Sequence, residues 1–175
     1  KKSRQLLRTL DKDQSKNLLE AGKRALIFES DASQTSEISS GCVKLIVTSP
    51  PFLNIVNYSE DNWLRCWFNN IDVKELANKI TMSKTLEDWS NKMEGVFAEL
   101  YRVLKKDGTI AFEVGEIRNG KIKLEDAVIP IAEKKGFVID EIMINQQRFT
   151  KTSNIWGVSN NQRGTNTNRI VLMRK

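Results

Sequence analysis

The sequence predicts an α/β domain built on one β-sheet that is mostly parallel, with an antiparallel last strand. Short apolar segments of strand length alternate along the chain with longer amphipathic segments of helical length. No helical segment separates the last two predicted strands, so we expect these two to be antiparallel neighbours. The 175 residues are enough for one domain with a sizeable core, and we expect a single domain over residues 1–175.

The first part of the chain predicts one helix and two strands. Leucines recur among charged residues and predict a helix at residues 4–22. An apolar run closed by an acidic turn predicts a buried strand at residues 26–30. A second apolar run predicts a strand at residues 45–48, which stops at Pro50 and Pro51 because proline cannot donate to a sheet ladder. We expect this second strand to lie inside the sheet and not at its edge.

The rest of the chain continues the alternation of helices and strands. Apolar residues at helical spacing predict helices at residues 61–68, 86–105 and 125–135. Apolar runs of strand length predict strands at residues 110–114, 138–143 and 170–173. All five predicted strands are expected to belong to one sheet, with the last strand alone running against the others.

Residues 145–168 differ in composition from the rest of the chain. They are rich in Asn, Gln, Thr and Ser and contain Arg148, Lys151 and Arg163 but no acidic residue. This pattern predicts a long polar loop that is either solvated or in contact with nucleic acid. The net charge of +6 is compatible with a polyanionic partner, although such a charge is also common in proteins that bind no nucleic acid.

The composition excludes several classes of enzyme and location. The chain has no histidine, which excludes a Ser-His-Asp or Cys-His catalytic arrangement from this chain alone and argues against a metal hydrolase. Its two cysteines form neither a disulfide framework nor a zinc spacing, so we expect no metal. No apolar run approaches the roughly 18 residues of a membrane span, and the charged N-terminus is unlike a signal peptide. We therefore expect a cytoplasmic protein without a membrane partner.

The stretch from Thr48 to Phe52 contains the candidate catalytic residues. Ligands in open α/β sheets bind beyond the carboxyl ends of strands, which is where these residues are expected. Two successive prolines, Pro50 and Pro51, give a rigid extended turn. The Ser49 hydroxyl and the Pro50 carbonyl can accept hydrogen bonds, and the Phe52 ring offers a flat stacking surface. This set suits a planar heterocycle that carries an amino group, although the same residues could be only a strand-terminating turn.

The stretch resembles the catalytic motif of the amino-methylating DNA methyltransferases, in which Ser, Asp or Asn precedes Pro-Pro and then Tyr or Phe. Residues 43–52, VKLIVTSPPF, are similar to the strand and motif of that family. Residues 99–109, ELYRVLKKDGT, are similar to the end of a helix in the family, and residues 168–175, NRIVLMRK, to its last strand. The resemblance covers about residues 26–175.

The resemblance implies a Rossmann-like sheet, S-adenosylmethionine as cofactor and double-stranded DNA as substrate. Ser49, Pro50, Pro51 and Phe52 would then be catalytic. Asp31 would accept a hydrogen bond from the adenine amino group of the cofactor, with Ala32 and Thr48 also at the cofactor site. Asp31 could instead be an ordinary helix cap or turn residue.

The family's use of Ser before Pro-Pro implies that the target is N4 of cytosine in a restriction-modification setting. Adenine N6 and a base in RNA are the alternatives.

One departure from the family concerns the cofactor. The family binds S-adenosylmethionine through a glycine-rich signature of the form DPFxGSGT, and the nine glycines here are scattered without such a run. We therefore expect the sheet to lack its first strands. The chain is then incomplete, is one piece of a split enzyme whose further chain or segment carries the glycine-rich motif, or has lost cofactor binding. The alternative is a non-catalytic subunit that holds DNA or a complete methyltransferase.

Three further residues are candidates for the site. Trp63 and Trp67 are four residues apart, so the predicted helix places them as neighbours, and packing is favoured over contact with a base. Cys66 has no preceding proline, unlike the nucleophile of enzymes that methylate carbon 5 of cytosine, and is expected to be structural.

Overall fold

The computed structural model describes residues 5, 7–51, 53, 62–75, 83, 85–117, 122–146 and 167–175. The chain divides into two compact units, Lys1–Ser30 and Asp31–Lys175, which we describe separately. The expectation of a single domain over residues 1–175 stays a prediction.

The first unit contains helix α2, Lys12–Lys23. The helix begins there because Asp11 and Gln14 form a capping box. The Asp11 carboxylate accepts a hydrogen bond from the Gln14 N–H at 2.7 Å, and the Gln14 side chain accepts one from the Asp11 N–H at 3.1 Å. The helix predicted at residues 4–22 is therefore confirmed from Lys12 onward and extends to Lys23, whereas residues 8–11 before it are not helical.

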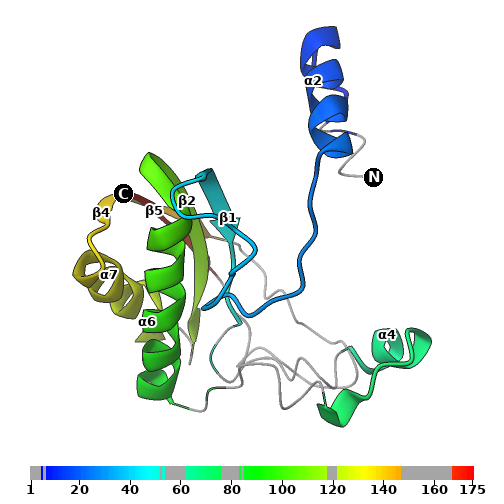
Figure 1. Ribbon diagram of the computed structural model, residues 1–175. Coiled ribbons are helices and arrows are strands. Elements are labelled where there is room, and N and C mark those ends of the chain that lie inside the picture. The colour runs from blue at the N-terminus through cyan, green and yellow to red at the C-terminus, as the bar shows by residue number, and fades with distance from the viewer. Residues whose placement is uncertain are drawn as a thin grey trace. The chain divides into compact units, whose positions relative to one another are not determined.

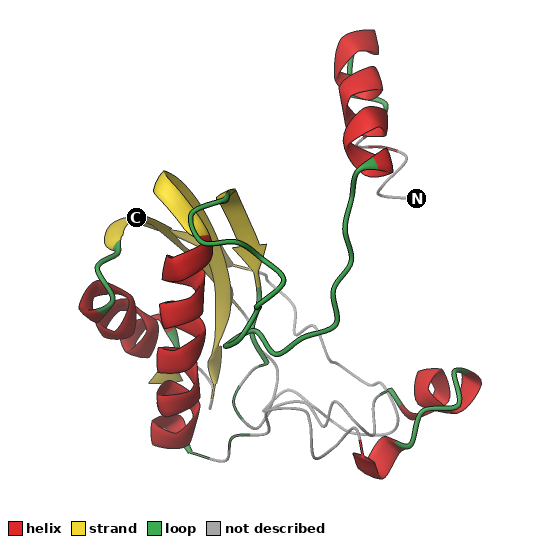
Figure 2. Ribbon diagram, in the orientation of Figure 1, coloured by secondary structure: helices red, strands yellow, loops and turns green. Residues whose placement is uncertain are grey.

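The predicted strand at residues 26–30 is wrong. These residues form a loop, drawn in green in Figure 2 between α2 and the second unit. Leu26 and Ile27 are 77% and 96% exposed. A short apolar run becomes a buried strand only where a neighbouring strand completes its hydrogen bonds and side chains cover its faces, and no described residue does this here.

The second unit contains a sheet in the order β1-β2-β5-β4, with the short β3 paired to β2. The strands are β1 Val43–Thr48, β2 Leu104–Ile117, β3 Ile122–Lys123, β4 Val138–Gln146 and β5 Thr167–Arg174. Strand β1 is parallel to β2, whereas β5 is antiparallel to both β2 and β4. Strands β1, β2 and β4 therefore point the same way. This confirms the mixed sheet with an antiparallel last strand.

Strand β1 lies at the edge of the described sheet, which corrects the expectation that it would be an interior strand. Its one described partner is β2, with Ile46 opposite Ile110 and Thr48 opposite Phe112. The outer side of β1 thus presents backbone N–H and C=O groups without a described strand beside them.

Two helices pack against this sheet, α6 Leu86–Val103 and α7 Glu125–Lys134. Helix α6 begins where the Thr85 hydroxyl accepts a hydrogen bond from the Asp88 N–H at 3.1 Å. It ends two residues earlier than the sequence predicts, because Leu104 is already extended and belongs to β2. The turn that follows is tight at Gly108, where a Cβ would lie 2.7 Å from the Leu104 side chain.

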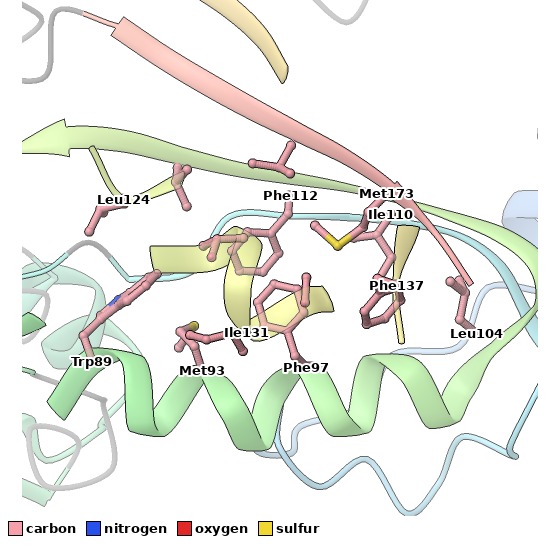
Figure 3. Packing of buried hydrophobic residues seen from close by; sticks show 14 of the residues in the cluster. Trp89, Met93, Phe97, Leu104, Ile110, Phe112, Leu124, Ile131, Phe137 and Met173 are labelled. Carbon is pink, nitrogen blue, oxygen red and sulfur yellow. The ribbon is translucent and has the colours of Figure 1, made fainter. Parts of the chain in front are cut away.

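The core lies on one face of the sheet, and both helices contribute to it (Figures 1 and 3). Phe97 of α6 packs against Phe112 of β2, with the ring centroids 4.8 Å apart. The same cluster includes Ile131 of α7 and Met173 of β5. Register partners such as Ile46, Ile110 and Met173 share this face. The remaining fully buried members of the cluster are Trp89, Leu104, Val114, Leu124, Val128, Ala132 and Val171.

The opposite face of the sheet carries exposed apolar side chains together with the charged residues Glu113, Glu141 and Arg174. Val47, Ala111 and Leu172 are register partners and therefore share this face. Val47 is 74% exposed, and Leu45, Val138 and Met143 on the same face are more than half exposed. Both described helices that pack on the sheet lie on the other side (Figure 1). In the described part of this unit, one face is covered and the other is open.

Candidate active site

The Pro-Pro turn lies at the carboxyl end of β1. The strand ends at Thr48, opposite Phe112 of β2. Ser49 follows with an exposed side chain, and Pro50 and Pro51 are half-buried. The carboxyl ends of the parallel strands β1 and β2 meet at the same edge of the sheet, the usual location of ligands in such folds. The turn therefore presents the Ser49 hydroxyl to solvent at that edge.

The N-terminal part of α6 holds the turn in place. The indole Nε1–H of Trp89 donates a hydrogen bond to the Pro51 carbonyl at 3.0 Å. Trp89 is 1% exposed, and Leu53, two residues after Pro51, is also buried in the core cluster. The helical spacing of apolar residues accounts for the burial of Trp89 but not for this polar contact. The signal was available, because a buried indole N–H needs an acceptor.

The acidic turn at Asp31 is a local structure. One carboxylate oxygen of Asp31 accepts hydrogen bonds from the backbone N–H of Ser33 at 2.8 Å and from its hydroxyl at 2.6 Å. The hydroxyl and then the backbone N–H of Ser33 lower the pKa of Asp31. The carboxylate is exposed and ionised at neutral pH, as is needed to accept from an amino group. The expectation that Asp31 ends a strand is wrong, since it lies in a loop next to the exposed Ala32.

The loop after Asp31 is fixed to α6 by a network of charged hydrogen bonds. The Glu99 carboxylate accepts from the backbone N–H of Thr35 at 2.7 Å and from its hydroxyl at 2.6 Å. Arg102 donates to the carbonyls of Thr35 and Ile38 at 2.9 and 2.8 Å, and also to Glu99. Arg102 and then Thr35 lower the pKa of Glu99 from 4.5 to about 2. The family resemblance includes this helix end, but it did not reveal the network.

Helix α6 therefore supports both candidate site segments. A Cβ at Gly95 would lie 3.5 Å from the Ser33 Cβ, so the Asp31 turn passes close to this point of the helix. Gly95 is six residues after Trp89, which corresponds to about 9 Å along a helix axis. The Asp31 turn and the Pro-Pro turn are thus anchored within about two helical turns of each other.

A polar cluster that the sequence did not predict lies further along the same edge. Asn168 donates a hydrogen bond to Glu113, and Arg169 forms a buried ion pair with Glu125 at the start of α7. Arg169 is opposite Val114 in the sheet register, just beyond Phe112. Burial is the main cause that raises the pKa of Glu125, and the Arg169 charge opposes it. The ion pair joins the start of α7 to the first residues of β5.

Several predicted site residues lie outside the described residues. They are Phe52, Arg148, Lys151 and Arg163. Among the residues that the structure does describe, no group of three or more His, Cys, Asp or Glu side chains is placed to hold a metal ion. None of the described helices is both long and apolar enough to cross a membrane.

Helix α4, Trp63–Phe68, confirms the short predicted helix but not the packing of its tryptophans. Both Trp63 and Trp67 are more than half exposed, whereas Cys66 between them is buried. The six-residue helix can bury only one narrow side, and Cys66 occupies it. The expectation that Cys66 is not a free surface nucleophile is consistent with this burial.

A mixed sheet whose parallel strands lead into a polar turn held by a neighbouring helix defines an α/β protein with its site at the carboxyl edge. Residues 43–174 match the family model described as DNA methylase, which covers N6-adenine and N4-cytosine methyltransferases. Because this match spans more than half of the chain, the chain belongs to that family.

Two curated relatives are type II methyltransferases. M.Cfr9I of Citrobacter freundii is 30% identical over 93 residues, which are 53% of this chain and 26% of the relative. M.XycI of Xanthomonas campestris pv. cyanopsidis is 28% identical over 91 residues, which are 51% of this chain and 25% of the relative. The chain therefore matches only about a quarter of the length of these relatives.

Solved structures share the fold. A Thermus thermophilus protein assigned as a DNA modification methylase, in complex with S-adenosyl-L-methionine, superposes with a TM-score of 0.51 at 18% identity, over 83% of this chain and 51% of that one. PvuII DNA methyltransferase, which is cytosine-N4-specific, gives a TM-score of 0.51 at 12% identity, over 84% of this chain and 48% of that one. The sheet is thus that of a methyltransferase of the Rossmann-like type.

Proposed function

We propose that this chain forms the catalytic half of a DNA methyltransferase that methylates the exocyclic amino group of a flipped-out base, N4 of cytosine. The observation that carries the proposal is the Ser49-Pro50-Pro51 turn at the carboxyl end of β1, in a chain that belongs to the DNA methylase family. The nearby Asp31 turn, anchored on the same helix, supports a cofactor site beside it.

The chain's own groups position the target amine. The Ser49 hydroxyl and the Pro50 carbonyl accept hydrogen bonds from the two amino hydrogens and draw the nitrogen lone pair out of conjugation with the ring. When bound, S-adenosylmethionine supplies a methyl group that its sulfonium already activates. The new N–C bond forms as the C–S bond breaks, and the amine then releases one proton to water. Such catalysis depends mainly on positioning and electrostatics.

The described residues fit one end of the cofactor. The exposed, ionised carboxylate of Asp31 is suited to accept a hydrogen bond from an adenine amino group, and Ala32 and Thr48 would lie at the same site. The described glycines, by contrast, form no consecutive turn that could cradle the methionine part. We propose that a glycine-rich segment outside these residues supplies that part. The open edge of β1 and the exposed apolar face around Val47 support this.

The proposed contacts with the substrate follow from the geometry of DNA. A base stacked in a duplex cannot reach a turn of this kind, so it has to flip out, and Phe52 would stack on it. Arg148, Lys151 and Arg163 would contact the DNA phosphates, which a net charge of +6 favours. Phe52→Ala should weaken engagement of the flipped base by about 1–3 kcal/mol, measured as DNA affinity with an unpaired target base.

The test uses the chain together with the segment that carries the glycine-rich motif. Digested DNA and RNA are analysed by mass after incubation with S-adenosylmethionine. We expect N4-methylcytosine in DNA, and we expect Ser49→Ala to lower turnover while the fold is retained. Ser39→Ala, another exposed serine, is the matched control and should be neutral. N6-methyladenine or a methylated RNA base would correct the target, and unchanged turnover in Ser49→Ala would remove Ser49 from the site.

Measurements of cofactor binding test whether the cofactor site is divided between this chain and the glycine-rich segment. We expect calorimetry to show weak or no binding of S-adenosylmethionine by the 175-residue chain, and binding to return when the glycine-rich segment is supplied. Asp31→Ala should then weaken binding, whereas Asp72→Ala should not. Tight binding by the chain alone would mean that another of its segments holds the cofactor.

A non-catalytic subunit is the second candidate, favoured by the open sheet face and by the absence of a glycine-rich run from the sequence. It predicts DNA binding without methyl transfer even after the segment is supplied. The mass analysis of digested DNA and RNA separates the two functions.

A further inference from the structure

We propose that Trp89 is a positioning residue for the Pro-Pro turn, because its hydrogen bond to the Pro51 carbonyl sets ψ at Pro51, a backbone angle that proline chemistry leaves free. This inference deepens the proposed function, and the expected effect of Trp89 on turnover rests on that function. The role of Trp89 in holding the turn does not depend on the reaction.

The covalent chemistry of the turn restricts almost all of its backbone. The pyrrolidine rings fix φ at Pro50 and at Pro51 near −65°. A following proline drives the residue before it into extended conformations, which restricts ψ at both Ser49 and Pro50. The angle ψ at Pro51 has no such restriction, because residue 52 is not a proline. That angle decides where the Pro51 carbonyl points and in which direction the chain leaves the turn.

The Trp89 indole fixes this remaining angle. Its N–H donates to the Pro51 carbonyl at 3.0 Å, within the ordinary range for such bonds. The ring is 1% exposed among Met93, Leu53 and the other core residues, so it cannot turn to bond water instead. A buried indole N–H without an acceptor is costly, and this makes one orientation of the carbonyl strongly preferred.

Helix α6 holds the backbone of Trp89 rigidly in place. Trp89 lies in the first turn of the helix, where the Thr85 hydroxyl caps the helix through Asp88, and its own N–H bonds to the Thr85 carbonyl at 3.1 Å. The helix continues into the core through Phe97. The turn is thus tied to a helix that is anchored in the core and not to a surface loop.

The consequence concerns the reacting geometry. The acceptors on Ser49 and Pro50 act only if they converge on one amine, and ψ at Pro51 sets the direction in which the chain leaves the turn. A displacement of about 1 Å in such a site can reduce turnover about 100-fold. Trp89 should therefore affect turnover while leaving cofactor affinity unchanged.

The experiment replaces the indole N–H and preserves the ring. Benzothienylalanine at position 89 has nearly the same shape as tryptophan but carries sulfur in place of N–H, and Trp89→Phe is the simpler genetic variant. Phe97→Leu is the control, since it perturbs the same core and the same helix without touching the turn. Turnover, KM and cofactor affinity are measured in the chain completed with its glycine-rich segment. NMR of the 175-residue chain reports on the turn itself.

We expect both Trp89 variants to lower kcat about 10- to 100-fold with an unchanged cofactor affinity. Phe97→Leu should lower thermal stability without this loss. NMR should show a Trp89 indole proton protected from exchange in the parent chain, and altered backbone shifts at Ser49 and Phe52 in the variants. Parent-like kcat with benzothienylalanine, or an indole proton that exchanges as fast as an exposed one, would overturn the proposal.

Failure of the proposed function gives a different result. If the completed parent enzyme transfers no methyl group to DNA or RNA, the enzymatic proposal fails, and the NMR comparison alone then decides whether Trp89 sets the turn. Unchanged shifts at Ser49 and Phe52 in both variants would refute Trp89 as a positioning residue in that case.

Discussion

The two faces of the sheet differ although they are made by the same strands. On one face, residues such as Ile110, Phe112 and Met173 are fully buried under α6 and α7. On the other, Leu45 and Val47 are 60% and 74% exposed. Exposed apolar surface can mark a site that binds another protein, a membrane or a ligand. The covered face supplies the stability of the chain as it stands, and the open face contributes little to it.

The largest effect should come from the covered face. Phe97→Ala removes a fully buried ring that contacts Phe112 and Phe137, and large-to-small substitutions of this kind cost about 3–5 kcal/mol. Urea unfolding followed by circular dichroism measures the loss. A cost well below this range, under about 1 kcal/mol, would mean that the covered face does not carry the stability of the chain.

A smaller effect should come from the network that joins α6 to the Asp31 loop. Glu99→Ala leaves Arg102 and Thr35 without their shared acceptor, and hydrogen bonds to charged groups contribute about 1.5–3 kcal/mol. Urea unfolding at neutral pH gives the difference from the parent chain. Glu94→Ala removes an exposed carboxylate of the same helix that pairs with Lys134, and it should cost much less.

The same network predicts a pH dependence. The folded-state pKa of Glu99 is lowered from 4.5 to about 2, so the unfolded chain takes up the proton first as the pH falls. The stability that this carboxylate contributes is full above about pH 4.5 and is lost as the pH falls toward 2. The difference between parent and Glu99→Gln should therefore shrink over this window. A constant difference down to about pH 2 would show that the charge of Glu99 is not the stabilising element.

The smallest effect on stability should come from the open face. Val47→Ala changes an exposed side chain and should alter the unfolding free energy of the 175-residue chain by no more than about 0.5 kcal/mol. After the glycine-rich segment is supplied, the same substitution should cost more, because the side chain becomes buried. Equal costs in both states would contradict the proposal that this face is covered in the complete enzyme.

The sequence alone determined the elements whose signals are local. Residues 86–103 show a helical apolar period long enough to be unambiguous, and the structure confirms this helix. Pro50 and Pro51 end β1 wherever the strand lies, because proline has no N–H to give to the ladder. The antiparallel last strand followed from the lack of a connecting helix, and the family followed from the motif and its flanking segments.

Tertiary structure decided what depends on partners distant in the sequence. The apolar run at residues 26–28 reads the same whether it is a buried strand or an exposed loop, and only the presence of neighbouring strands and covering side chains distinguishes the two. Whether β1 lies inside the sheet or at its edge likewise depends on which strands pair beside it, and in the described sheet it lies at the edge. The bond from Trp89 to Pro51 joins residues 38 positions apart, and no periodicity predicts which acceptor a buried indole finds. Hydrogen bonds between residues so far apart in the sequence form only when the chain has folded and packed. No local sequence pattern predicts them for this reason.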